Sequence, residues 1–224
     1  VLRYGDHKPI LDEVSFSVRN GSKVALMGQN GAGKTSLFKL VLGEVKLSDG
    51  AIFKTPLNAT IGIAKQVIPA EQMDMTIREW FETTFHEKNY ALDKHIADVL
   101  DAVNLQTDLT KKVREHSGGQ QARLLLAYAL IQDPDILLLD EPTNNLDQTG
   151  IDHLTAYLMS YEKTVIVISH DADFLNCFTD SVLYLDVHTQ KIEKYVGNYL
   201  DVVQEIAERV ERERAANARA EMEI

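Results

Sequence analysis

The segment Gly28-Gln29-Asn30-Gly31-Ala32-Gly33-Lys34-Thr35 decides how this chain of 224 residues folds. It fits the pattern G-x-x-x-x-G-K-[ST]. Its glycines let the backbone curl so that successive N–H groups point at one centre, where they suit phosphate oxygens. Lys34 can reach the outer phosphates, and the Thr35 hydroxyl is a suitable ligand for Mg²⁺. The segment therefore predicts a phosphate-binding loop between a strand and a helix.

The residues on both sides of this loop have the patterns that its mechanism requires. The run from Lys23 to Met27 predicts a strand, and it follows the turn signal Asn20-Gly21. After the loop, Leu37, Leu40 and Val41 have helical spacing, and Gly43 suits the end of that helix. The positive end of the helix dipole would then face the bound phosphates.

The rest of the chain predicts an α/β fold with a mainly parallel sheet. Strand patterns alternate with helix patterns, which implies a sheet covered on both faces. Alternation at Val14, Phe16 and Val18 predicts a half-buried strand in an N-terminal antiparallel β part. Residues 67–132 show helix patterns only, so we expect a helical subdomain inside a domain of residues 1–198. Residues 199–224 lack Gly and Pro and predict a charged helix that leaves this domain.

Composition limits the class of protein. Hydrophobic residues make up 45% and charged residues 25%, which is ordinary for a soluble domain, and no apolar run approaches the ~20 residues of a membrane span. The single cysteine, Cys177, excludes an intrachain disulfide and suits a reducing compartment, so we expect a cytoplasmic protein. The net charge of −11 argues against a general nucleic-acid binder but leaves room for a local basic contact.

A second chemical signal is the apolar run Ile136 to Leu139 followed by Asp140 and Glu141. A buried strand that ends in acids places carboxylates at the carboxyl edge of the sheet, where ligands bind in open α/β folds. Asp140 is suited to hold Mg²⁺, and Glu141 to orient or deprotonate an attacking water. Without the phosphate loop, the same pair would be interpreted as a loop cap.

A third signal, Ser117-Gly118-Gly119-Gln120, precedes the helical pattern of residues 124–130. Alone, it would be interpreted as a helix cap. Together with the phosphate loop and the acidic pair, it resembles the nucleotide-binding domain of the ATP-binding-cassette (ABC) superfamily, over nearly all of residues 1–198. The resemblance implies that two such domains stack head to tail and that each signature motif completes the ATP site of the other.

The resemblance also assigns roles to individual residues. It implies that Tyr4 stacks on adenine, that Gln66 senses Mg²⁺ and the γ-phosphate, and that His170 is the switch histidine. The expected nucleotide-binding residues are Tyr4, Gly28, Gln29, Asn30, Gly31, Ala32, Gly33, Lys34, Thr35 and Ser36. The expected catalytic residues are Lys34, Glu141 and His170, and the metal ligands are Thr35, Gln66 and Asp140. The signature comprises Ser117, Gly118, Gly119 and Gln120, and Asp147 lies in a partner-contact loop. His116 departs from the family, which usually has leucine there.

Three further segments are similar to the ABC-F branch: Glu141 to Asp147, Ser169-His170-Asp171, and Tyr195 to Tyr199. Members of that branch join two cassettes by a long helical linker, have no membrane domain, and in many cases bind the ribosome. The resemblance thus implies an ATP-hydrolysing translation factor or antibiotic-resistance protein with a second cassette and ribosomal RNA as partners. Residues 199–224 would begin the linker, although their acids outnumber their arginines.

Two other functions remain open from the sequence. The alternative is the ATPase subunit of a membrane transporter, in which Trp80, Phe81 and Phe85 would form either a docking groove or, as we expect, plain core. A cassette that only binds ATP is disfavoured, because Lys34, His170 and the acids at 140 and 141 are all present.

Overall fold

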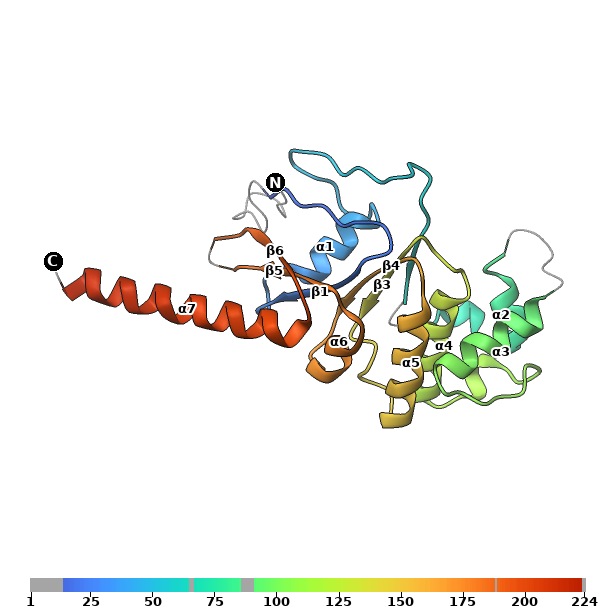
Figure 1. The fold of residues 1–224 in the computed structure, drawn as a ribbon. Coiled ribbons are helices and arrows are strands. Elements are labelled where there is room, and N and C mark those ends of the chain that lie inside the picture. Colours follow the sequence, from blue (N-terminus) through green and yellow to red (C-terminus); the bar gives the residue numbers. More distant parts are fainter. Residues whose placement is uncertain (1–13, 65–66, 86–90, 188, 223–224) are drawn as a thin grey trace.

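A six-stranded sheet with the order β2-β3-β4-β1-β5-β6 forms the centre of the computed structural model (Figure 1). The structure describes residues 14–64, 67–85, 91–187 and 189–222, with side chains up to residue 212. The strands are β1 (Lys23–Gly28), β2 (Ile61–Ile63), β3 (Ile136–Asp140), β4 (Thr164–Ile168), β5 (Ser181–Leu185) and β6 (Ile192–Val196). All neighbouring pairs are parallel except β5 and β6. The predicted α/β class is confirmed.

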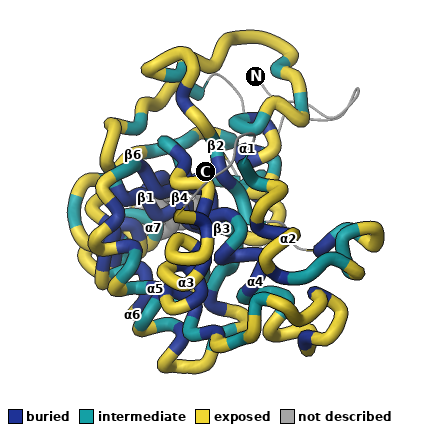
Figure 2. The backbone as a smooth tube through the Cα atoms, turned by 90° about the vertical axis from the view of Figure 1, so that its right-hand side faces the viewer, coloured by how far each residue is buried: buried dark blue, intermediate teal, exposed yellow. Residues whose placement is uncertain are grey.

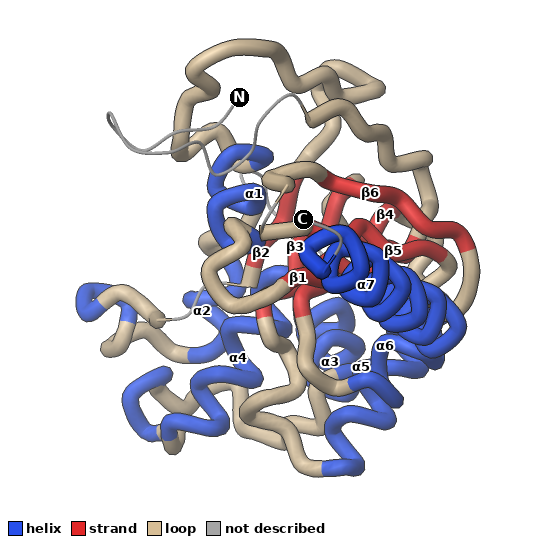
Figure 3. Tube along the Cα trace, turned by 90° about the vertical axis from the view of Figure 1, so that its left-hand side faces the viewer, coloured by secondary structure: helices blue, strands red, loops and turns tan. Residues whose placement is uncertain are grey.

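Helices cover both faces of this sheet, in agreement with the apolar runs of its central strands. Every residue of β4 and β5 is buried, and Figure 2 shows the dark core along the strands. One face carries α1 (Lys34–Val41), whose Leu37, Phe38 and Leu40 pack on β1. The opposite face carries α4 (Gly118–Leu130), α5 (Gln148–Ser160), α6 (Ala172–Phe178) and the start of α7 (Tyr199–Met222) (Figure 3). Beyond them, α3 (Leu92–Ala102) packs on α4 and α5, and α2 (Ile77–Glu82) packs on α3 (Figure 1).

The stretch from residue 67 to 132 consists of α2, α3, α4 and two short 3₁₀ helices, η1 (Ala70–Gln72) and η2 (Val113–Glu115). The start of α2 is fixed by a capping box, in which Thr76 and Glu79 satisfy each other's backbone N–H groups. Trp80 and Phe81 are 1% and 0% exposed, and Trp80 stacks on Tyr128 of α4 at 4.5 Å. These aromatic residues are therefore core, and they offer no open docking groove.

The predicted strand at residues 14–19 is wrong. No strand is assigned between residues 14 and 22, and Phe16 is 37% exposed. The Ser17 carbonyl accepts a hydrogen bond from the Lys194 ammonium instead of a strand N–H. Residues 1–13 lie outside the described part of the chain. The antiparallel strand of the sheet is β6, which the sequence analysis did not predict.

The final helix, α7, begins on the body of the protein and then projects from it (Figure 1). Tyr199, Val202 and Ile206 are buried against the core. One turn later, Arg209 pairs with Glu193 of β6 and lies over the Tyr184 and Tyr195 rings. Within the described residues, no helix is both long and apolar enough to cross a membrane.

Candidate functional site

The phosphate-loop segment connects β1 directly to α1, as predicted. Gly31 and Gly33 have φ of 83° and 99°, a left-handed conformation that glycine adopts without strain. At Gly28 a Cβ would lie 2.7 Å from the Leu185 carbonyl oxygen, so the loop fits close against β5 only as glycine. Gln29, Asn30 and Gly31 are exposed, whereas Ala32 is buried and Ser36 half-buried.

Lys34 lies folded over this loop. Its Nζ donates hydrogen bonds to the carbonyl oxygens of Gly28 at 2.6 Å and Gln29 at 3.2 Å. The ammonium group thus forms hydrogen bonds with two backbone carbonyl oxygens at the mouth of the loop. A phosphate oxygen carries a full negative charge, so it can replace these carbonyls as the stronger partner of the ammonium.

Asp140, at the end of β3, lies beside the first turn of α1. The Thr35 hydroxyl donates to its Oδ2 at 3.5 Å, a distance at the limit of a hydrogen bond. Burial raises the pKa of the Asp140 carboxyl above its usual value, and Thr35 and Lys34 oppose that shift. A half-buried carboxylate beside a hydroxyl is a donor set that fits Mg²⁺, which commonly takes one or two protein oxygens and fills its other positions with phosphates and water.

Glu141 and His170 form a pair where β3 and β4 end side by side. His170 Nε2 lies 3.2 Å from Glu141 Oε1, and the His170 backbone N–H donates to Oε2, also at 3.2 Å. Glu141 has a φ of 51°, which is uncommon for a residue with a side chain. Its N–H donates to the Ile168 carbonyl, which holds this turn against β4. The carboxylate is 21% exposed and the imidazole 72%, so the pair opens to solvent on one side.

A cavity of about 290 Å³ opens next to this pair. Asp140, Glu141 and Arg123 contribute to its wall, together with Ala64 at the end of β2. Gln66, the predicted Mg²⁺ sensor, follows Ala64 by two residues but lies outside the described residues, as does Tyr4.

The signature segment caps α4 on the opposite face of the sheet from α1. Ser117 and Gln120 form a capping box: the Ser117 N–H donates to Gln120 Oε1 at 2.9 Å, and the Gln120 N–H donates to Ser117 Oγ at 3.4 Å. Gly118 and Gly119 are exposed, and no atom lies within 4 Å of where their Cβ atoms would be. The start of α4 therefore presents backbone to open space, as an anion-binding helix terminus requires.

His116 anchors this segment with polar contacts where the family usually has leucine. It is buried, its Nε2 lies 2.7 Å from the Thr107 hydroxyl, and its Nδ1 lies 3.0 Å from the Lys112 carbonyl oxygen. Both ring nitrogens have partners, so burial of the imidazole leaves no polar atom unsatisfied.

Asp147 caps α5, six residues after Glu141. Its Oδ1 accepts from the Gly150 N–H at 3.1 Å and from Arg123 Nη2 at 3.0 Å. The Gly150 hydrogen bond, and then the Arg123 charge, lower the pKa of the Asp147 carboxyl. Arg123 also donates from Nη1 to the Asn104 carbonyl at 2.8 Å. This arginine links the signature helix, the end of α3 and the loop of Asp147. The sequence analysis did not identify it, because its partners are 19 and 24 residues away.

Comparison with known proteins places this geometry in a family. A family model described as ABC transporter matches residues 11–144. The chain is 37% identical over 209 residues to "Probable ATP-binding protein YheS" of Escherichia coli K12, covering 90% of the chain and 31% of that protein. It is 30% identical over 258 residues to "ABC transporter F family member 5" of Arabidopsis thaliana, covering 96% of the chain and 37% of that protein. The chain thus spans about a third of the length of these relatives.

Solved structures agree with this fold. A chain titled "Structure of ATP binding subunit of ABC transporter" superposes with a TM-score of 0.77 at 20% identity, covering 91% of this chain and 89% of that one. A second, titled "Dimeric Structure of MJ0796, a Bacterial ABC Transporter Cassette", has a TM-score of 0.72 at 22% identity, covering 86% and 93%.

Proposed function

The chain belongs to the ABC transporter family as one of its ATP-binding ATPase domains, and we propose that it is one cassette of an ABC-F protein that hydrolyses ATP as a switch on the ribosome. The contact between Glu141 and His170 beside Asp140 supports the hydrolytic part of this proposal. Similarity to relatives such as "ABC transporter F family member 5" supports the ABC-F assignment. A role in translation or in antibiotic resistance by ribosome protection would place the protein in the cytoplasm.

ATP binding would begin with an exchange of partners at Lys34. Its ammonium would leave the Gly28 and Gln29 carbonyls for the β- and γ-phosphates, and the N–H groups of residues 28–36 would surround the phosphates. Thr35, Asp140 and Gln66 would hold Mg²⁺, which when bound neutralises phosphate charge. Tyr4 would stack on adenine.

Hydrolysis would then depend on Glu141. Its carboxylate is held from two sides by the ring and the backbone of His170, which fixes its orientation toward the end of the sheet. We assign Glu141 the role of orienting and deprotonating the attacking water, and His170 that of holding Glu141 and contacting the γ-phosphate.

The second face of the ATP site would come from another cassette, in the same polypeptide or in a second copy. The exposed start of α4, with Ser117 to Gln120, would bind the γ-phosphate of the partner's ATP. Asp147 would lie in the loop that contacts the partner. Only six residues separate Glu141 from Asp147, so a change at the ATP site around Glu141 would be passed along the chain to the loop that contacts the partner cassette.

The domain division that fits this function is a cassette of residues 1–198, with the helical stretch 67–132 inside it, and a linker that begins at residue 199. Arg209 and Glu193 hold the first turns of α7 on the cassette, so a movement of the cassette would be passed to the projecting part of the helix.

Glu141→Gln tests this function in the longest reading frame that contains the chain. The amide retains the shape of the carboxylate but does not accept the water proton, so ATP would bind without being cleaved. With ATP, we expect the variant to pellet with ribosomes to a much greater extent than the wild type, and with ADP we expect no difference. Equal pelleting of the two proteins with ATP would refute the ribosomal switch.

A further inference from the structure

The charge of this chain is distributed unevenly along its sequence. Residues 14–64 contain six basic and two acidic residues, a net charge of +4. The whole chain has a net charge of −11, so the remaining residues sum to −15. A strongly acidic protein thus contains a basic segment at residues 14–64, and of the lysines in that segment only Lys34 is used by the phosphate loop.

The fold gathers this segment on the α1 side of the sheet. The hydrophobic cluster beneath α1 includes Val14 and Val18, Val45 and Leu47, and Ile192 of β6. Lys194 of β6 donates to the Ser17 carbonyl, and Asn20 donates to the Thr55 carbonyl, so three separate segments form one surface. We call this surface the α1 face; it comprises residues 14–20, α1, residues 42–60, and residues 191–194.

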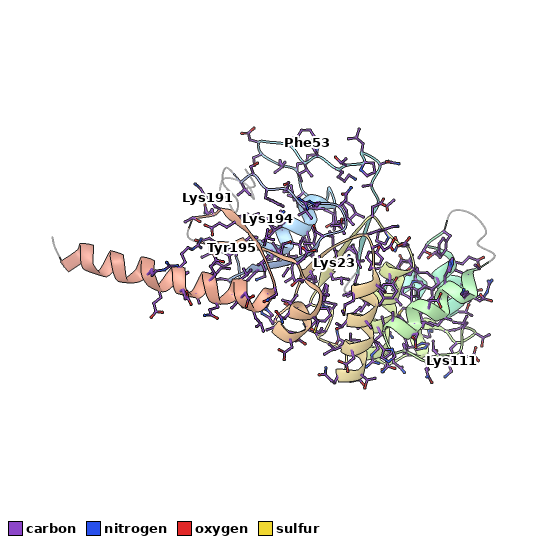
Figure 4. All side chains as sticks on the ribbon, in the orientation of Figure 1. Lys23, Phe53, Lys111, Lys191, Lys194 and Tyr195 are labelled. Atoms are coloured by element: carbon purple, nitrogen blue, oxygen red, sulfur yellow. The ribbon has the colours of Figure 1, made fainter. Side chains whose placement is uncertain are left out.

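Exposed cations and an exposed aromatic ring lie together on the α1 face. Its exposed basic side chains are Arg19, Lys39, Lys46, Lys191 and Lys194. The acids are the exposed Glu44 and Asp49, the half-buried Glu193, which pairs with Arg209, and the half-buried Asp186 nearby. Phe53 is 85% exposed and Leu57 is 84% exposed. Figure 4 shows Phe53, Lys191 and Lys194 on the upper side of the molecule, and Lys111 at its opposite end.

We infer that the α1 face binds an RNA backbone, with Phe53 as a platform on which an unpaired base stacks. The choice of RNA rests on the proposed ribosomal function. Lysines on separate segments can follow a line of phosphates, and an exposed aromatic ring on the same face can stack on any base. A second group of cations lies in residues 111–123, but Lys112 and Arg114 pair with Asp74, and Arg123 pairs with Asp147. The α1 face therefore presents the larger set of exposed cations to a polyanion.

An anionic membrane is the other polyanion that lysines and exposed apolar side chains can suit. Membrane-surface binding typically uses a helix with an apolar face toward the lipid. On the α1 face the only helix of the described residues is α1, and its apolar side chains Leu37, Phe38 and Leu40 are already buried in the core. The α1 face therefore suits a single-stranded RNA better than a lipid bilayer.

The test measures binding of a fluorescent twelve-nucleotide oligouridylate to the 224-residue chain by anisotropy, as KCl is varied. With about four phosphate contacts, a plot of the logarithm of the association constant against the logarithm of the KCl concentration should have a slope of about −3. Lys46→Glu with Lys191→Glu should weaken binding at least about tenfold at low salt and reduce the slope. Phe53→Ala should weaken binding about tenfold and leave the slope unchanged.

Matched controls separate this surface from overall charge and apolarity. Lys94→Glu with Lys111→Glu makes the same change in net charge at exposed positions away from the α1 face, and Met159→Ala removes an exposed apolar side chain from α5. Both controls should bind RNA nearly as the wild type does. All variants should retain the wild-type melting temperature and ATP affinity.

Three results would overturn the inference: no salt-dependent binding, equal loss in Lys94→Glu with Lys111→Glu, or Phe53-dependent binding to phosphatidylglycerol vesicles in place of the oligonucleotide. Oligonucleotide binding requires neither ATP nor a second cassette. Its failure would leave the Glu141→Gln ribosome experiment able to succeed, and failure of that experiment would leave this measurement unaffected.

Discussion

Replacing Arg123 by alanine tests whether the signature helix is tied to the loop of Asp147 as the structure indicates. The Arg123 side chain is 17% exposed and that of Asp147 is 63% exposed, so we count their ion pair as a surface interaction that adds little to stability. The bond from Nη1 to the Asn104 carbonyl is partly buried and joins a charged donor to the backbone, which adds about 1.5 kcal/mol. The expected loss is about 1.5 kcal/mol, or about 3–6 °C in melting temperature for a domain of this size.

Two further variants make this measurement specific. Arg123→Lys keeps the charge but presents a single ammonium, so it should recover only part of the loss. Arg114→Ala removes another arginine–aspartate pair, in which both side chains are more than half exposed, and should change stability by less than about 0.5 kcal/mol. Urea unfolding of the 224-residue chain and of the three variants gives these differences. The link from Arg123 to both Asp147 and Asn104 would be refuted if Arg123→Ala lost no more stability than Arg114→Ala. It would also be refuted if Arg123→Lys were as stable as the wild type.

Two other substitutions test the phosphate loop and its acid. Burial raises the pKa of Asp140, so the folded chain holds this proton more tightly than the unfolded chain, and the carboxylate destabilises the fold once the pH exceeds both pKa values. Asp140→Asn should therefore raise the melting temperature of the nucleotide-free chain at neutral pH. The increase should shrink as the pH falls toward the ordinary aspartate pKa of about 4. Calorimetry across that pH range measures the difference, and a variant less stable than the wild type at about pH 7 would contradict this prediction. Gly28→Ala places a Cβ 2.7 Å from the Leu185 carbonyl oxygen and should cost about 1–3 kcal/mol and weaken ATP binding. Gly119→Ala, with open space around it, should be neutral or slightly stabilising in the same unfolding assay, and equal losses in the two variants would remove the steric argument.

The parts of the fold that the sequence predicted are those set by local patterns. The phosphate-loop segment, the strand before it and the helix after it lie as expected. The acids after β3 reach the carboxyl edge because a buried parallel strand ends there. In each case a contiguous run of residues carries the whole signal.

The errors and omissions occur where structure depends on distant partners. Alternation at residues 14–18 predicted a strand, but the Ser17 carbonyl bonds Lys194, 177 residues away, and no ladder forms. The short strand β6 was missed because it forms by pairing with β5. The sequence shows His116 where the family usually has leucine, but it does not show the two hydrogen bonds that satisfy this histidine within the fold. Sequence spacing does not reveal such contacts.

The most direct test of the central claim is the steady-state rate of ATP hydrolysis by the complete paired protein, in the wild type and in Glu141→Gln. If Glu141 activates the water, the variant should bind ATP with wild-type affinity and turn it over at least about a hundredfold more slowly, which is the usual contribution of a positioned general base. Turnover at the wild-type rate by the glutamine variant would contradict the assignment of Glu141 and, with it, the ATP-driven switch.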